Sequence, residues 1–281
     1  MKYHCLCLSP AIDASVTLPE APRGVGEVFK DVPAVENVGG KGLNVARWLA
    51  LRGATVSCGG FLGEENARPF EDELRRYGIR DCFTRVPGAT RRNEMITWPG
   101  GSFKVNQPAF PGLREEALGL DLDELESGDV VILSGSLPKD FPANCYARII
   151  AACHARDITT VLDASGAALA AGFAARPDVI KPNADECEAL VGFVPKMPAD
   201  FRQVTRLLKE KVSYPIISDG ARGCWFDETF VPAPSVSVVD TTAAGDTLLA
   251  EWCFSRDPVR AVAAGSAACK MPGSQPPPLS L

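Results

Sequence analysis

The segment DTTAAGD (240–246) combines small residues with carboxylates in a pattern that suits chemistry on a phosphate group. It follows the β-branched Val238 and Val239 and precedes an apolar helical pattern, which predicts a strand, a tight turn and a helix start. The N–H groups of a helix's first turn point outward at the positive end of the helix dipole, and small residues let a ligand approach them closely. We therefore expect the backbone at Ala243, Ala244 and Gly245 to bind phosphate.

The aspartate that ends this segment, Asp246, has two interpretations. A carboxylate beside an anion site repels a bound phosphate, so Asp246 is better suited to accept a proton from an attacking hydroxyl group. Alternatively, it only charges a helix N-terminus, which acidic residues stabilise by about 0.3–1 kcal/mol. Taken alone, the segment leaves both interpretations open.

A second glycine-rich segment, NVGGKGLNVAR (37–47), favours the first interpretation. It places Gly39, Gly40 and Gly42 at the start of a predicted helix whose first turn carries Asn44. The segment has neither the GxxxxGK[ST] spacing of a Walker A loop nor the GxGxxG spacing of dinucleotide-binding proteins. Three glycines permit close approach of a polyhydroxylated ligand, and Lys41 and Asn44 can donate hydrogen bonds to its hydroxyl groups.

Composition limits the classes of partner. The chain has 281 residues, 46% of them hydrophobic, and a formal net charge of −6. A chain of this size can bury a substantial core, and we expect one main domain. The acidic balance predicts repulsion of nucleic acid and of acidic membranes. No apolar run approaches the roughly 20 residues of a membrane span, so we expect a cytoplasmic protein.

The ten cysteines do not form a recognisable metal or disulfide framework. There is no CxxC pair, and His4 and His154 stand apart from other potential ligands. We expect the cysteines to be small buried hydrophobic residues in a reducing compartment.

Short β-rich runs alternate with helical patterns along most of the chain, which predicts an α/β fold with a mainly parallel sheet covered by helices on both faces. The helix after the strand 130–134 carries one apolar stripe, made by Tyr146, Ile149, Ile150 and Cys153. The expected strands are Tyr3–Leu8, Thr55–Phe61, Val130–Ser134, Thr159–Asp163, Val179–Lys181 and Pro215–Ser218.

Two regions interrupt this alternation, near residues 14–38 and 88–108. The first holds two candidate strands around a Pro/Gly turn, and the second reads as a hairpin across Pro99-Gly100-Gly101. Both lack a following helix, which favours a small antiparallel sheet that projects from the main one. Such a sheet would serve as a lid over a site or as an edge for dimerisation.

The pairing of GGKGLNVA with DTTAAGD closely resembles the signatures of the ribokinase-like, or PfkB, carbohydrate kinases. Further similar motifs follow in the family's order along nearly the whole chain: LSPAID (8–13), GGFLGEEN (59–66), SGSLP (134–138), KPNADE (181–186) and SDGARG (218–223). Within the family, TRRN (90–93) and VLDASGAAL (161–169) resemble the branch of 1-phosphofructokinase, tagatose-6-phosphate kinase and minor 6-phosphofructokinase. The resemblance implies a three-layer α/β/α sandwich with a small β-sheet lid that forms a homodimer interface.

The resemblance also implies roles for residues. Asp246 would deprotonate the acceptor hydroxyl of a sugar or sugar phosphate, and the backbone of Ala243, Ala244 and Gly245 would stabilise the γ-phosphoryl group of ATP. For Asp13 the alternative is an aspartate that caps a turn. The residues expected to bind the sugar are Asp13, Gly39, Gly40, Lys41, Asn44 and Ser136.

Asn183 and Glu186 match the family's NxxE element, which implies that they help to organise Mg²⁺ through water. In sequence the same pair reads as a capping box at a helix start, and both roles are compatible. Lys181 would reach the nucleotide phosphates. We expect Ser218, Gly220 and Gly223 to line the nucleotide pocket together with Lys181 and Asn183.

Cationic residues in the predicted lid bear on whether the substrate already carries a phosphate. The family resemblance assigns the arginine of T-R-x-N, here Arg91, to that phosphate, and Lys104 would assist it. Solvated charges on the wet face of a hairpin are the alternative. A kinase of a free sugar or nucleoside, and a weakly catalytic sugar-phosphate-binding protein, therefore remain as alternative functions.

The C-terminal region departs from the family's pattern, because only 35 residues follow Asp246. We expect the helix that begins near Ala244 to end at about Ser255, and the proline-rich PGSQPPPLSL (272–281) to replace the family's last helix. Leu249, Glu251 and Trp252 stand where the family has small residues, so the local packing must differ.

Overall fold

The computed structural model describes residues 1–108, 113–114, 118–139 and 141–279. Within this part of the chain, nine strands form one sheet in the order β13-β12-β11-β10-β9-β8-β1-β4-β5. All neighbours from β5 to β11 are parallel, and a β12–β13 hairpin ends one edge. The bounds are β1 (Tyr3–Cys7), β4 (Val56–Gly63), β5 (Arg80–Val86), β8 (Val130–Ser134), β9 (Thr159–Asp163), β10 (Val179–Ile180), β11 (Tyr214–Ser218), β12 (Gly223–Phe226) and β13 (Thr229–Pro232).

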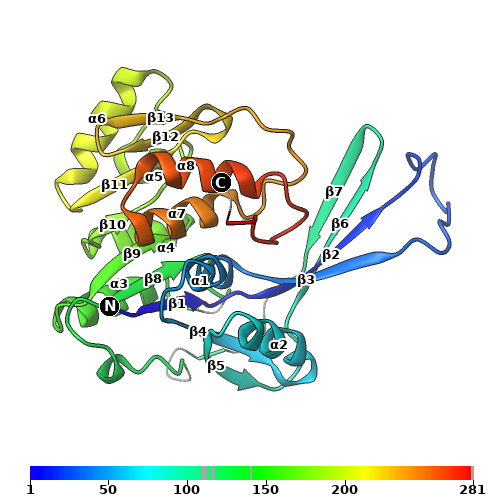
Figure 1. Cartoon of the computed structure of the whole chain (residues 1–281), viewed down its shortest axis with the longest axis horizontal. Coiled ribbons are helices and arrows are strands. Elements are labelled where there is room, and N and C mark those ends of the chain that lie inside the picture. The colour runs from blue at the N-terminus through cyan, green and yellow to red at the C-terminus, as the bar shows by residue number, and fades with distance from the viewer. Residues whose placement is uncertain (109–112, 115–117, 140, 280–281) are drawn as a thin grey trace.

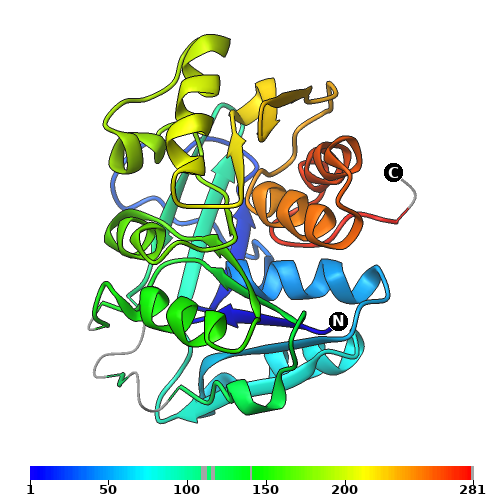
Figure 2. The same cartoon turned by 90° about the vertical axis from the view of Figure 1, so that its left-hand side faces the viewer.

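Helices cover both faces of this sheet, as the alternating pattern predicts. Successive side chains of a strand point to opposite faces, so Tyr3 and Cys5 pack with one cluster and Leu6 with the other. One face is covered by α1 (Lys41–Leu51), α2 (Arg68–Arg76), α7 (Ala244–Ser255) and α8 (Pro258–Ala268). The other is covered by α3 (Cys145–His154), α4 (Gly166–Ala174), α5 (Cys187–Val191) and α6 (Pro198–Lys209). Figure 2 shows the two layers, with blue α1 and orange α7 opposite the green α3 and α4.

The apolar stripe predicted after β8 is confirmed, since Tyr146, Ile149, Ile150 and Cys153 of α3 are all buried. Eight of the ten cysteines are buried as well, as the sequence predicts, and all ten are free thiols. Among the described residues, no helix combines the length and the apolar character needed to cross a bilayer.

The two interrupting regions form a second, four-stranded sheet in the order β3-β2-β6-β7, which projects from the main body (Figure 1). Its strands are β2 (Ala11–Thr17), β3 (Ala34–Gly39), β6 (Arg92–Trp98) and β7 (Gly101–Asn106). The expected hairpin is confirmed, but the sheet is not purely antiparallel, because β2 and β6 run parallel. Both strands leave the main sheet in the same direction, after β1 and β5, and this fixes their relative orientation. We call this sheet the lid.

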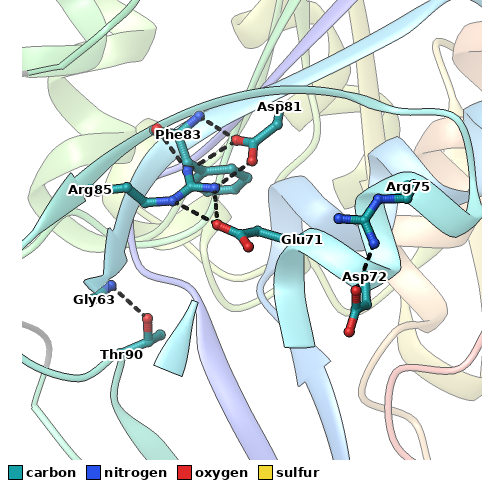
Figure 3. Close-up of polar contacts among 8 residues, drawn as sticks. All are labelled: Gly63, Glu71, Asp72, Arg75, Asp81, Phe83, Arg85 and Thr90. Carbon is teal, nitrogen blue, oxygen red and sulfur yellow. Dashed lines mark hydrogen bonds and ion pairs between the residues drawn. The ribbon is translucent and has the colours of Figure 1, made fainter. Parts of the chain in front are cut away.

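The entry to β6 is fixed by hydrogen bonds at Thr90 (Figure 3). Its Oγ1 accepts from the backbone N–H of Gly63 at 2.9 Å. In addition, its backbone exchanges hydrogen bonds with the side chain of Asn66 at 2.6 and 2.9 Å. Nearby, Arg85 on β5 donates to Glu71 of α2 at 2.7 Å and to Asp81. These contacts hold the edge of the main sheet from which the lid leaves.

The strand expected at Val238 and Val239 does not form. Both side chains are exposed, and the N–H groups of Val239 and Asp240 donate to the carbonyl of Cys269 at 2.8 and 3.1 Å. The segment is therefore held against the end of α8 rather than paired with a strand.

The expectation for the C-terminal region is partly wrong. The helix that begins at Ala244 does end at Ser255, but a further helix, α8, follows it. Asp257 caps this helix, since its carboxylate accepts from the N–H of Val259 and Arg260, and Pro258 occupies the first turn. The proline-rich tail begins only after α8, and its last two residues, 280–281, lie outside the described residues.

Candidate active site

The motif residues meet at the carboxyl ends of the parallel strands. The chain leaves β1 towards β4 on one side and later returns to β8 on the other, so β1 marks a point where the strand order reverses. In open α/β sheets such a point opens a crevice beyond the strand ends. Two cavities lie in this region, one under the lid and one beside α7 and α8.

The first cavity, of about 280 Å³, lies between the lid and the ends of β1, β8 and β9. It collects nearly all the residues predicted to bind a sugar. These are Asp13, Gly40, Lys41, Asn44, Arg91, Lys104 and Ser136, and Asp246 lies in the same wall. Gly39 instead lies behind Asp13, where a Cβ atom would come within 2.4 Å of the carboxylate Oδ2.

The second cavity, of about 620 Å³, lies between the β11–β12 turn, the loop 233–241 and helices α7 and α8. It contains Asn183, Ser218, Gly220 and Gly223, four of the five residues expected to line a nucleotide pocket, whereas the fifth, Lys181, does not line it. Part of its wall is apolar, supplied by Val236, Val238, Leu248, Val262 and Cys269. Helix α8, which was not expected, contributes Val262 and, at its C-cap, Cys269 to this wall.

Asp246 lies in the first turn of α7, at the boundary of the two cavities. Thr242 and Asp246 line the first cavity, while Ala244 and Gly245 line the second. The Asp246 side chain makes no capping bond to its own helix; its Oδ2 accepts from Nδ2 of Asn44 on α1 at 2.8 Å. Although it lines a cavity, Asp246 is only 2% exposed. Asp246 therefore does not cap α7 through a hydrogen bond, its charge still lies in the first turn of the helix, and its Oδ1 is left to face a ligand.

The electrostatic surroundings of Asp246 favour a group that can take up a proton near neutral pH. Its pKa is raised to about 6, chiefly by burial and also by the neighbouring Asp163, against the opposing effect of Lys41. The hydrogen bond from Asn44 and the charge of Lys181 act in the lowering direction. A base whose pKa lies near the working pH is both ionised and basic enough to accept a proton.

Asp163, at the end of β9, connects Lys41, which was predicted to bind the sugar, with Lys181, which was predicted to reach the nucleotide phosphates. Its buried Oδ1 lies 3.2 Å from Nζ of Lys41 and 3.2 Å from Nζ of Lys181. Burial alone would raise the pKa of Asp163, but Lys181 and Lys41 outweigh it and hold the pKa below its usual value. In turn, Asp163 raises the pKa of Lys41. Lys181 also approaches the start of α7, where a Cβ on Gly245 would lie 3.5 Å from its Nζ.

The backbone at the start of α7 partly matches the predicted anion site. The N–H of Ala244 donates to the carbonyl of Thr241 at 3.2 Å, so it is engaged in a turn. A helix has no internal acceptors for its first N–H groups. The groups best placed for an anion are therefore those of Ala243, Gly245 and Asp246.

Asp13 lies within β2 rather than in a turn, so the alternative of a turn cap is wrong. Its Oδ1 accepts from Nδ2 of Asn93 on the neighbouring strand β6 at 2.8 Å. Asn93 belongs to the TRRN motif, but no role was predicted for it. Its own Oδ1 is buried without a hydrogen-bond partner among the described residues.

Arg91 lies at the base of the lid and not in its exposed hairpin. Its guanidinium donates to the carbonyls of Pro10, Ser9 and Gln107 at 3.2, 3.1 and 3.4 Å, which fixes it at the rim of the first cavity. Burial lowers its pKa. Lys104 approaches the same cavity from β7, whereas Arg92 turns away to an ion pair with Glu36. Of the cations Arg91, Arg92 and Lys104, only Arg91 and Lys104 therefore line the cavity.

Asn183 and Glu186 form a reciprocal capping box, as one interpretation predicted. Glu186 Oε2 accepts from the N–H of Asn183 at 2.9 Å, and Asn183 Oδ1 accepts from the N–H of Glu186 at 2.8 Å. The second carboxylate oxygen of Glu186 remains for a hard cation or its water. Among the described residues, no three His, Cys, Asp or Glu side chains converge on a metal position. This donor set fits Mg²⁺ held mainly by water and phosphate, as that ion prefers.

Several cavity residues were not anticipated: Ser9, Asn93, Asn106, Ser134, Ser165 and Thr242. Ser9, Ser134 and Ser165 lie at or within two residues of the carboxyl ends of β1, β8 and β9, and polar residues at such positions are the signal that would have found them. Asp163 carries the same signal, as the last residue of a buried strand.

The chain was then compared with known proteins. Residues 20–275 match the model of the pfkB family of carbohydrate kinases. The chain is 35% identical over 254 residues to the 1-phosphofructokinase of Haemophilus influenzae, covering 84% of this chain and 81% of that one.

Two further proteins are similar. The tagatose-6-phosphate kinase of Staphylococcus epidermidis is 30% identical over 262 residues, covering 87% and 82% of the two chains. The structure of phosphofructokinase-2 from Escherichia coli in complex with substrates and products superimposes with a TM-score of 0.83 at 25% identity, over 96% of this chain and 93% of that one. The chain belongs to the PfkB family of carbohydrate kinases.

Proposed function

We propose that this chain transfers the γ-phosphoryl group of ATP to a hydroxyl group of a hexose phosphate, with Asp246 as the general base. The observation that carries the proposal is the position of Asp246, buried at the boundary between a polar cavity and a partly apolar one. An acceptor hydroxyl in the first cavity and a phosphoryl group arriving from the second would meet at this carboxylate.

The proposed reaction depends on positioning and charge stabilisation. Asp246 accepts the proton of the attacking hydroxyl on Oδ1, while Asn44 holds Oδ2. The N–H groups of Ala243, Gly245 and Asp246 stabilise the negative charge on the transferring phosphoryl group, and Lys181 lies beside Gly245. Asp163 holds Lys41 and Lys181 at a common carboxylate, which keeps both ammonium groups directed at the transfer point.

The polar residues of the first cavity suit a sugar. Asp13 and Asn93 together offer acceptors and donors to adjacent hydroxyl groups, and Ser134 Oγ is buried without a partner among the described residues. A phosphate on the sugar would be bound by Arg91 and Lys104 at the rim. A phosphorylated substrate is supported by the names of the relatives, 1-phosphofructokinase and tagatose-6-phosphate kinase.

We assign the second cavity to ATP. Its apolar wall of Val236, Val238 and Val262 suits an adenine base, and its polar end at Gly245 suits the phosphates. Asn183 and Glu186 would hold Mg²⁺ through water, and the ion would neutralise charge on the nucleotide phosphates. A cytoplasmic location, where ATP and sugar phosphates are available, is part of the same proposal.

We also propose a homodimer through the lid. The lid exposes the apolar side chains of Val35, Phe103 and Val105, and its outer strands β3 and β7 each have an unpaired edge within the described residues. Exposed apolar groups and open strand edges favour association. Light scattering after gel filtration tests this proposal, and a monomer at micromolar concentration would contradict it.

The proposed activity is tested by measuring ATP consumption with Mg²⁺ on fructose 1-phosphate, fructose 6-phosphate, tagatose 6-phosphate, ribose, fructose and adenosine. We expect turnover on a phosphorylated hexose and little on the free sugars. Turnover confined to ribose, fructose or adenosine would contradict the phosphorylated substrate. Binding without turnover on any of them would contradict the kinase.

A further inference from the structure

Behind the proposed base, a buried arginine contacts the residue that holds it. Arg47 lies on α1, one turn after Asn44, and only 2% of its surface is exposed. Its Nη2 lies 2.5 Å from Oδ1 of Asn44, while Nη1 donates to Glu73 of α2 at 2.9 Å. Arg47 does not line the first cavity, so it acts on a ligand there only through other residues.

The chemistry of the two side chains fixes the orientation of the Asn44 amide. A guanidinium group only donates hydrogen bonds, so the atom of Asn44 that faces Arg47 must be the carbonyl oxygen. The NH₂ group then faces Asp246 and donates to its Oδ2. With the amide turned over, a carbonyl oxygen would face the carboxylate, and only a protonated Asp246 could form that hydrogen bond.

The C-terminal segment completes this arrangement. Ser274 is buried, and its hydroxyl must donate to the carbonyl of Val38, at 3.2 Å, because a carbonyl only accepts. Arg47 Nη2 lies 3.1 Å from the same hydroxyl oxygen and 3.2 Å from the carbonyl of Val38, so Ser274 and Val38 share the second N–H of Nη2. Gly273 and Gln275, on either side, bond to Asp240 and Asn37, which anchors the segment.

We propose that Arg47 is a positioning residue that fixes the orientation of the Asn44 amide, and that Ser274 of the C-terminal segment holds Arg47 in place for this task. The inference rests on the proposed function, in which Asp246 is the general base. The proposal also gives a role to the proline-rich tail after α8, because Ser274 of this tail would hold Arg47 in place.

Other charged groups face Asp246 and must be considered in any test that follows its protonation. Lys41 on α1 and Lys181 after β10 favour its ionised form, and Asp163 on β9 disfavours it. Arg47 itself faces the carboxylate of Glu73. Lys41, Lys181 and Asp163 are kept in every variant below, so their effects on the pKa of Asp246 stay constant. Glu73 is replaced in one double variant only.

The test is a titration of the Asp246 carboxyl group by ¹³C NMR in the free protein, with the signal assigned by its loss in Asp246→Asn. We expect Arg47→Met to raise the pKa of Asp246 by about one unit, because the Asn44 amide is no longer held in place and its hydrogen bond to the ionised carboxylate is lost or weakened. Arg47→Lys keeps a donor near Asn44 and should restore most of the original pKa. Ser274→Ala should shift the pKa in the same direction as Arg47→Met, by a smaller amount.

An unchanged Asp246 pKa in folded Arg47→Met would overturn the proposal. Arg47→Met could fail to fold because it leaves Glu73 unpaired. In that case the double variant Arg47→Met/Glu73→Gln and the single variant Ser274→Ala are titrated instead, and an unchanged Asp246 pKa in both would overturn the proposal. The titration needs no turnover, so it remains decisive even if the wild-type chain proves inactive as a kinase. With an active enzyme, the acid limb of kcat/KM should move by the same amount in each variant.

Discussion

The buried carboxylate of Glu251 joins the two helices that carry the proposed site, and its removal is expected to be costly. Glu251 lies on α7, the helix of Asp246, and is fully buried. Its Oε2 accepts from Nε1 of Trp48 on α1 at 2.8 Å and lies 3.2 Å from Nε of Arg52, while its Oε1 contacts Arg260 of α8 at 3.2 Å.

Glu251→Ala would leave the Trp48 N–H without its acceptor and the guanidinium of Arg52, 17% exposed at its side chain, without its partner. Removing one partner of a buried ion pair costs about 3–5 kcal/mol, because the other charge stays buried. Arg260 adds little, since its side chain is 48% exposed and water replaces the lost contact. We therefore expect the free energy of unfolding to fall by about 3–5 kcal/mol.

Chemical denaturation followed by circular dichroism measures this loss. The matched control is Glu228→Ala, which removes an exposed ion pair with Arg206 at 3.8 Å and should cost less than about 1 kcal/mol. Glu251→Gln keeps an acceptor for Trp48 and should fall between the two. If Glu251→Ala loses no more stability than Glu228→Ala, the proposed connection between α1 and α7 is wrong.

Three further predictions concern the site. Because the base must be ionised, kcat/KM should be retained above a pH of about 6 and should fall about tenfold for each pH unit below it. The substrate phosphate also titrates near pH 6, so the pH profile of kcat/KM is compared with the ¹³C titration of Asp246 to separate the two groups. Arg91→Ala should raise KM for a hexose phosphate about tenfold or more and leave any weak turnover of free hexose unchanged, and equal effects on both would contradict a phosphate contact. Glu186→Gln should raise the Mg²⁺ concentration needed for half-maximal rate, whereas an unchanged Mg²⁺ curve would remove Glu186 from the metal site.

Much of the fold was predictable because its strands carry strong local signals. The runs VVILS (130–134) and TTVLD (159–163) form strands with the expected bounds, since both are rich in β-branched residues, which favour strands. Asp246 and Asn44 are 202 positions apart in sequence and in direct contact in the structure, and only the pairing of two motifs indicated this.

Other features depend on contacts that no local pattern reveals. Val238 and Val239 have strand propensity, but their backbone binds Cys269 at the end of a helix. Helix α8 is rich in Ala, Gly and Ser and has a weak apolar stripe, so its periodicity did not indicate a helix. Ser274 reads as part of a proline-rich tail, and its burial against Val38 follows only from the assembled fold.

The most direct test of the account is the rate of Asp246→Asn on the hexose phosphate that the wild type phosphorylates. The substitution keeps the shape of the side chain and removes its basicity, so kcat should fall by about 10²–10⁴-fold with KM nearly unchanged. Because burial raises the pKa of Asp246 to about 6, its ionised form costs stability above that pH, and the variant should melt no lower than the wild type at pH 7. A folded Asp246→Asn protein with near-normal kcat would contradict the assignment of Asp246 as the base.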